Sequence, residues 1–363
     1  MDSSATPRDE VRRFIVENRP VRGHWVRLEG AWRELRAHRD YPQPVRELLG
    51  QAVAASVLLA ATLKFRGQLT LQLQGNGAVS LLVAQCTHDY RLRAVARFDT
   101  EAVSALSAMG EPRSGERPRT TRGPGALPPR TATGTASGEI FRRERPRTTR
   151  GPGALSPGKA SGTASAEVFR RLVGSEGRFA VTVEADERNM RYQGIVPLSG
   201  DSLAGSLEAY FARSEQLPTR VLLAADGERG AGVLVQKLPE DAAAEDLEMS
   251  EVWEQAERGI ERLSPEDLLR CPVEELLGRG FAAQDMRLFR GTPVQFECRC
   301  SHGRVTSLLR ALGPDEVRDV LREQGSVTVT CEFCHRPYRF DEGAVEALFE
   351  DGPEPGGNPS TVH

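Results

Sequence analysis

Four of the six cysteines in this 363-residue chain form two close pairs near its C-terminus. One residue separates Cys298 from Cys300, and two residues separate Cys331 from Cys334. The 30 residues from 301 to 330 lie between the pairs. Such spacing is typical of two short loops that bring four thiolates around one metal ion. Zinc is the metal we expect, because it is the usual occupant of a tetrahedral thiolate site.

Two other uses of the second pair are weaker explanations. His335 follows Cys334 and completes the Cys-x-x-Cys-His sequence of c-type haem attachment. That chemistry belongs to exported proteins and would leave Cys298 and Cys300 without a role. A thioredoxin-like site is also disfavoured, because no helical pattern begins at Cys334. Four unrelated free thiols would not explain paired spacing on both sides.

The predicted site contains sulfur in a reactive form. Zinc-bound cysteine is already deprotonated, and the thiolate is the form that oxidants attack. A disulfide across Cys-x-Cys closes a very small ring, so it is strained and readily reduced, which suits a reversible switch. Arginines near the cysteines could lower the thiol pKa values further, although solvated surface charge is the simpler interpretation of them. They are Arg299, Arg304, Arg336 and Arg339.

The cysteines belong to a small module that we place at residues 293–351, followed by a disordered tail at 352–363. Helices and strands are predicted in it at 305–312, 314–324, 327–331 and 338–340, with Gly325 as a helix C-cap. A core of this size supplies only about 3 to 5 kcal/mol, whereas a structural zinc contributes on the order of 10 kcal/mol. The module should therefore unfold when zinc leaves.

Charge and composition argue against a nucleic-acid or membrane partner. The net charge is -3, without the basic excess that nucleic-acid binding favours. The longest apolar run, residues 48–63, is shorter than the roughly 20 residues of a membrane span and predicts a buried core helix. The first ten residues lack the apolar core of a secretory signal, so we expect a cytoplasmic protein. In that reducing compartment, paired cysteines bind metal or do redox chemistry.

Residues 1–240 are predicted to form one α+β domain with an antiparallel sheet. Apolar residues alternate in 69–73 and 79–83 on either side of Gly75-Asn76-Gly77, which indicates a β-hairpin. Other predicted strands are 91–98, 179–183, 192–198, 221–225 and 232–238, and predicted helices include a short one around Trp32, 45–63 and 203–214. Since these patterns occur on both sides of an insertion at about 110–172, the insertion interrupts one domain.

The insertion contains a 28-residue tandem repeat, 116–143 and 144–171. It is rich in Pro, Gly, Thr and Arg, and its few apolar residues cannot bury a stacked core, so we predict a disordered surface loop. It carries 12 basic and 4 acidic residues. A polyanion-binding arm is one interpretation, but no aromatic residues are interleaved for base stacking, and a solvated insertion is favoured.

Residues 241–292 form a predicted acidic helical linker. Apolar residues recur at three- and four-residue spacing from Met249 to Leu263. Ser264 and Pro265 then carry the signals of a helix N-terminus. Helices of this length are marginal alone and need a surface to dock on. A permanent packing element and a segment that can undock both fit the sequence.

The other two cysteines have no predicted role. Cys86 lies near His88, but a Cys and a His without a third group are more often ordinary core and surface residues. Cys271 belongs to no motif.

The C-terminal module resembles the redox-switch domain of the heat-shock protein 33 family in its cysteine pairs, their spacing and residues 338–341. Members of that family are bacterial redox-regulated holdase chaperones. Other segments are similar to the N-terminal domain of that family, and the resemblance covers nearly everything outside residues 110–172. These segments are 18–23, 63–65, 71–75, 192–196, 210–219 and 236–239.

The resemblance implies a function. Cys298, Cys300, Cys331 and Cys334 would bind Zn²⁺ when reduced. Oxidation would join Cys298 to Cys300 and Cys331 to Cys334, expel the metal, and unfold the module and linker. The exposed surface would then hold unfolding client proteins without ATP, as a homodimer and with no enzymatic activity. The alternatives are a constitutively zinc-bound interaction protein and a thiol-disulfide oxidoreductase.

Overall fold

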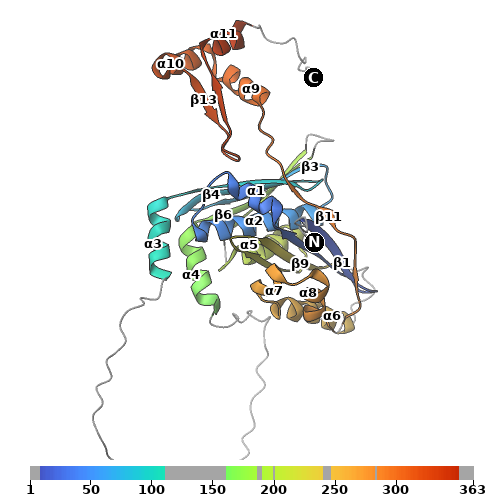
Figure 1. Ribbon diagram of the computed structural model, residues 1–363. Helices are drawn as coiled ribbons and strands as arrows, with labels where there is room; N and C mark the ends of the chain where they lie inside the picture. Colours follow the sequence, from blue (N-terminus) through green and yellow to red (C-terminus); the bar gives the residue numbers. More distant parts are fainter. Residues whose placement is uncertain are drawn as a thin grey trace, which may run out of the picture.

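The computed structural model describes residues 9–110, 161–185, 190–198, 201–239, 247–282 and 284–350. Two six-stranded sheets form the body of the protein, and a small module stands beyond them at the C-terminal end (Figure 1). All strand pairs are antiparallel except the short β12–β5 pair. The predicted α+β class with antiparallel pairing is therefore confirmed for the body.

The first sheet joins the start of the chain to segments more than 200 residues later. Its order is β10-β1-β2-β9-β8, with β11 also pairing with β1. The strands are β1 (Glu10–Val16), β2 (Val21–Leu28), β8 (Thr219–Ala225), β9 (Gly230–Lys237), β10 (Met286–Leu288) and β11 (Thr292–Pro293). The strands predicted at 221–225 and 232–238 pair as the β8–β9 hairpin. It turns at Asp226, whose side chain accepts hydrogen bonds from the amides of Glu228 and Arg229 at 2.7 Å.

The second sheet has the order β12-β5-β4-β3-β6-β7. Its strands are β3 (Gly67–Gln74), β4 (Val79–Thr87), β5 (Arg91–Phe98), β6 (Arg178–Ala185), β7 (Met190–Pro197) and β12 (Gln295–Phe296). The predicted β3–β4 hairpin is present, and Leu69, Leu71 and Leu73 are buried as their alternation requires. Since β3 pairs with β6 along its whole length, segments before and after the insertion share one sheet.

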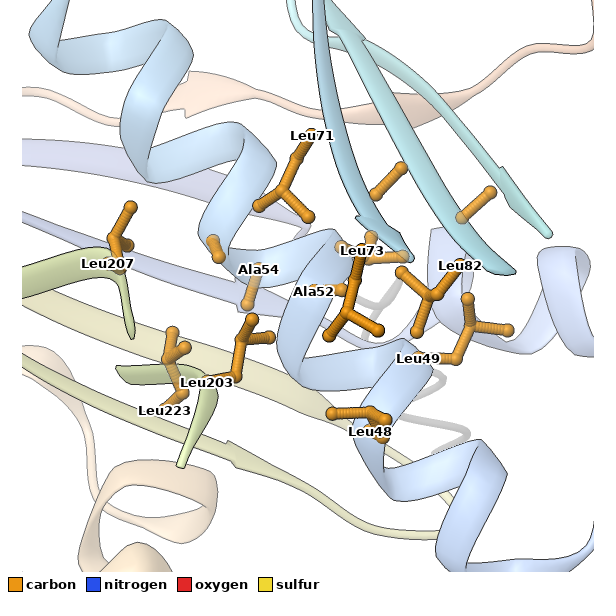
Figure 2. Packing of buried hydrophobic residues seen from close by; sticks show 14 of the residues in the cluster. Leu48, Leu49, Ala52, Ala54, Leu71, Leu73, Leu82, Leu203, Leu207 and Leu223 are labelled. Carbon is orange, nitrogen blue, oxygen red and sulfur yellow. The ribbon is translucent and has the colours of Figure 1, made fainter. Parts of the chain in front are cut away.

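Helix α2 (Gln43–Thr62) lies between the two sheets and forms the centre of the core. Figure 2 shows Leu71, Leu73 and Leu82 on one side of it, and Leu203, Leu207 and Leu223 on the other. By length and composition α2 could cross a membrane, but 78% of its most apolar stretch is buried inside the protein. Helix α2 is therefore buried, as predicted for a core helix from the sequence.

Shorter helices surround this core: α1 (Gly30–Ala37), α3 (Thr100–Gly110), α4 (Ser161–Val173) and α5 (Leu203–Tyr210). Ser202 caps α5, and the last turn of the helix predicted at 203–214 is widened into a π-helix, η1 (Phe211–Glu215). Helix α4 corrects the prediction that the insertion is disordered as far as residue 172. Its Phe169 and Leu172 are buried in the core, because tertiary contacts order the end of the second repeat. Residues 111–160 and the predicted tail lie outside the described residues.

Three helices cover the face of the first sheet opposite α2: α6 (Leu247–Glu261), α7 (Pro265–Arg270) and α8 (Val273–Gly280). Their apolar side chains, including Val252, Ala256 and Leu276, form one buried cluster with Phe14 and Trp25 of the sheet. A capping box begins α7: the Ser264 hydroxyl accepts from the Asp267 amide at 3.0 Å, and Asp267 accepts from the Ser264 amide at 3.1 Å.

The C-terminal module contains α9 (His302–Leu312), α10 (Pro314–Gln324), β13 (Val327–Thr330), β14 (Pro337–Phe340) and α11 (Glu342–Glu350). It has its own buried cluster, centred on Leu309, Phe340 and Val345. Its predicted start at residue 293 is too early. Residues 292–296 form β11 and β12, and Val294 is buried in the core of the body, so the module begins after them.

We expect Leu276→Ala to loosen α6–α8 from the sheet. Leu276 is fully buried, and truncating a buried leucine costs about 2 to 5 kcal/mol. Hydrogen exchange of peptides covering 247–280 should accelerate more than that of peptides covering α2. Glu261→Ala, an exposed position on α6, is the matched control. Unchanged exchange protection in Leu276→Ala would contradict this packing.

Candidate metal centre

The two cysteine pairs lie in two separate loops of the module. Cys298 and Cys300 lie in the extended segment between β12 and α9, and the Ser301 hydroxyl caps α9 by accepting from the Arg304 amide at 3.3 Å. Cys331 and Cys334 lie in the turn that joins β13 to β14. The Cys331 carbonyl accepts from the His335 amide at 2.8 Å, which closes this turn.

The structure brings all four sulfur atoms together, within 4.8 Å of one another. The Sγ atoms of Cys298 and Cys331 are 3.6 Å apart, and those of Cys300 and Cys334 are 3.3 Å apart. Four sulfurs at about 2.3 Å from a central metal would have edges of about 3.8 Å. The cluster can therefore hold a tetrahedral ion such as zinc after small adjustments.

The pKa values of the thiols show why a cation suits this cluster. Burial raises the pKa of Cys334 to about 12, and hydrogen bonds with the other three thiols add to the effect. Burial also raises the pKa of Cys298. At Cys300 burial acts in the same direction, but the polar hydrogens of Tyr338 and the other thiols outweigh it and bring the pKa to about 7. Crowded sulfurs cannot all ionise alone, and a divalent cation would compensate their charge.

The arginines named from the sequence have different positions. Arg336 faces the sulfurs: the Tyr338 hydroxyl and then the charges of Cys300 and Cys334 raise its pKa. Arg304 instead donates to the Arg299 carbonyl at 2.8 Å. Arg299 points away from the cluster and donates to Gln68 of β3.

Arg93 of β5 is a site residue that the sequence analysis missed. Its guanidinium lies 4.1 Å from the centre of the Phe333 ring, inside the Cys331–Cys334 turn. Burial lowers the pKa of Arg93, and the thiolate of Cys298 opposes that shift. More than 200 residues separate Arg93 from the cysteines, and no local pattern links them.

The remaining candidates do not belong to the group of four sulfurs. His335 follows the turn, but the ligand group contains only the four cysteines. Because Cys331 and Cys334 converge with Cys298 and Cys300, the arrangement favours a shared ion over haem attachment. Cys86 is fully buried in β4, where burial strongly raises its pKa. Cys271 ends α7, with its thiol 3.7 Å from the Asp267 carboxylate.

Comparison with known proteins gives one consistent result. Residues 9–341 match the family described as Hsp33 protein. A protein of Chromobacterium violaceum described as 33 kDa chaperonin is 35% identical to this chain over 343 residues. One of Nitrosococcus oceani with the same description is 36% identical over 344 residues. The alignments cover 94% of this chain and of the first relative, and 95% of both chains for the second. The crystal structure of a 33 kDa chaperonin from Thermotoga maritima is similar in fold, with a TM-score of 0.67 and 20% identity over 94% of this chain and 98% of that one.

We expect the reduced protein to bind one cobalt ion in a tetrahedral thiolate environment. Cobalt is the probe because its visible spectrum reports ligand type and geometry. Cys334→Ser should abolish the thiolate-to-cobalt absorption, whereas Cys271→Ser should leave it unchanged. Full retention of the spectrum in Cys334→Ser would exclude this site.

Metal affinity should also decrease as the pH falls. The Cys334 thiol, with its pKa near 12, must lose its proton before the sulfur can bind a metal. Each displaced proton reduces the apparent affinity by about ten-fold per pH unit. Zinc competition with a chelator of known pH dependence, measured below and above neutral pH, tests the sign and the slope.

Proposed function

Because this chain belongs to the Hsp33 family, we propose that it is a redox-regulated, ATP-independent chaperone that binds unfolding proteins and prevents their aggregation. The observation that carries the proposal is the convergence of four thiols from two loops in a module with a small core of its own. The relatives described as 33 kDa chaperonin, which align over almost the full chain, support the chaperone assignment.

In the reduced state, Cys298, Cys300, Cys331 and Cys334 would hold Zn²⁺. When bound, zinc would neutralise part of the thiolate charge and cross-link the segment before α9 to the β13–β14 hairpin. The fit of the sulfur separations to a tetrahedron supports this assignment. Burial of Cys334 and half-burial of the other three thiols would limit access of water and oxidant to the cluster.

Oxidation would remove the ligands in pairs. Cys298 and Cys300 would form one disulfide, and Cys331 and Cys334 the other. Each pair of thiolates gives up two electrons as its S–S bond forms. One hydrogen peroxide molecule accepts these electrons with two protons and becomes two water molecules. The four sulfurs then carry no charge, so the module loses its affinity for the cation.

Loss of the metal would destabilise two parts of the chain. The module has a small apolar cluster and leaves Leu308 and Leu312 exposed, at 52% and 55%. Helices α6–α8 lie immediately before it and depend on the sheet for their buried face. Their release would uncover apolar side chains of both the helices and the sheet. We propose that this surface holds clients, in a homodimer of the oxidised protein.

The same proposal defines the other properties of the protein. A reducing cytoplasm would keep the thiols free until oxidative stress occurs. All six cysteines are free thiols in the structure. We assign no nucleic-acid or membrane partner. We also assign no catalytic turnover, because the cysteines would act once per switching event.

Oxidation should release zinc and activate the chaperone together. We expect peroxide or hypochlorite to release one zinc per chain and to make the protein suppress aggregation of a chemically unfolded client. A thiol reductant with zinc should reverse both effects. The measurements are chelator absorbance for zinc and light scattering for the client, with Cys86→Ser as a matched control outside the cluster.

Other outcomes would select other functions. Oxidised protein that keeps its zinc, or protects clients no better than reduced protein, would favour a constitutive zinc-bound interaction protein. Repeated turnover of a small disulfide substrate would favour a thiol-disulfide oxidoreductase.

A further inference from the structure

The outer face of the second sheet carries a line of polar side chains that reaches both cysteine loops. Residues on this face of β3, β4 and β5 alternate with the core residues Leu69, Ala84 and Leu92. The polar side chains are Gln68, Thr70, Gln85, Arg91, Arg93 and Arg97. The body therefore meets the module through these polar side chains, although Val83 and Val95 lie on the same face among them.

One end of this line holds the first cysteine loop. Arg299, the residue between Cys298 and Cys300, donates from its guanidinium to the Gln68 side-chain oxygen. Gln68 in turn donates to the Thr70 hydroxyl at 3.2 Å. The side chain enclosed by the Cys-x-Cys pair is thus fixed on β3.

The other end holds the second loop. Phe333 stacks on the Arg93 guanidinium at 4.1 Å, and Glu332 pairs with Arg97. Both residues lie between Cys331 and Cys334, so β5 contacts the two side chains enclosed by the Cys-x-x-Cys pair. Arg91 adds an ion pair to Glu297, immediately before Cys298.

A hydrogen-bond chain connects the two ends and orients Arg93. Gln85 accepts from Arg93 Nε at 2.7 Å and donates to the Thr70 hydroxyl at 3.1 Å. The path from Arg299 to Arg93 therefore runs through Gln68, Thr70 and Gln85 without a break. With its Nε held, Arg93 presents the rest of its guanidinium to Phe333 and the nearby Cys298 and Cys331.

We propose that the sheet is part of the redox sensor, with Arg93 as a positioning residue that binds the reduced, anionic sulfur cluster and releases it on oxidation. The proposal rests on the proposed redox function. Four thiolates around a divalent cation carry a net charge of about -2. Once each pair has given two electrons to peroxide and formed a disulfide, that charge is gone. The attraction to Arg93 is lost, and Arg299, Glu332 and Phe333 must move with their loops.

Linkage makes this contact reciprocal. If docking on the sheet is stronger for the reduced cluster, docking must stabilise the reduced, metal-bound state by the same factor. Weakening the contact should therefore lower zinc affinity and make oxidation easier. The body would thus help to set the oxidant concentration at which the module responds.

The decisive experiment compares Arg93→Gln with Arg178→Gln in the full, reduced, zinc-loaded chain. Arg178 lies on the same outer face, on β6, and is exposed. Chelator competition should give a zinc dissociation constant about ten-fold higher for Arg93→Gln, since hydrogen bonds to charged groups have about this effect. Zinc release at a fixed peroxide concentration should also be faster. Arg178→Gln should match the unmodified protein in both measurements.

Two further measurements separate a charge effect from a packing effect. Added salt should weaken zinc binding in the unmodified protein more than in Arg93→Gln. Only the unmodified protein has the attraction between the Arg93 guanidinium and the sulfur cluster that salt can screen. Arg97→Glu and Glu332→Arg should each speed zinc release by about two-fold, as expected for an exposed ion pair. Combining them should restore the slower rate.

Equal zinc affinity and salt dependence in Arg93→Gln and Arg178→Gln would overturn the proposal. If Arg93→Gln unfolds the sheet, the charge exchange between Arg97 and Glu332 still tests the proposal. A double variant that does not recover the slower rate of zinc release would also overturn the proposal. The affinity measurements need no oxidation and no client. Failure of the oxidised protein to protect clients would therefore overturn the proposed function while leaving the role of Arg93 measurable.

Discussion

Crowding of four cysteine sulfurs within 4.8 Å is the constraint on which the C-terminal part of this structure depends. Sulfurs this close resist simultaneous ionisation. Burial raises the pKa of Cys334 to about 12, with hydrogen bonds from the other thiols adding to it, whereas at Cys300 hydrogen bonds outweigh burial and bring the pKa to about 7. A bound cation would reverse that repulsion and join two loops that lie about 30 residues apart. The module around them buries few large side chains, so a bound metal would contribute much of its stability.

The body of the protein does not share this dependence. Helix α2 is buried between two sheets, and strands from both sides of the insertion pair along their full lengths. Between body and module, α6–α8 have one apolar face on the first sheet, while β10, β11 and β12 hold the following chain against both sheets. The buried apolar clusters therefore become smaller from the body, through α6–α8, to the module. Under the proposed mechanism, this difference would let the C-terminal part unfold while the body stays intact.

The contacts between body and module are polar, which distinguishes them from the core contacts. Arg91 and Arg97 of β5 meet Glu297 and Glu332, and Arg93 stacks on Phe333. Contacts of this kind respond to charge, whereas apolar packing does not. A change in the charge of the sulfurs can therefore alter how the module sits on the sheet without repacking either core.

The sequence by itself determined the features that depend on local pattern. Alternation in Leu69, Leu71 and Leu73 predicted β3, Ser264 and Pro265 predicted the start of α7, and the spacing of the cysteine pairs predicted one shared cluster. Strands β10, β11 and β12 were missed, since two or three residues cannot show a period and only their partners order them. Helix α4 was missed because its ordering comes from the burial of Phe169 and Leu172 against distant segments. Arg93 and Gln68 reach the cysteine loops only because the chain returns to their sheet some 200 residues later, and such proximity is decided by the tertiary structure alone.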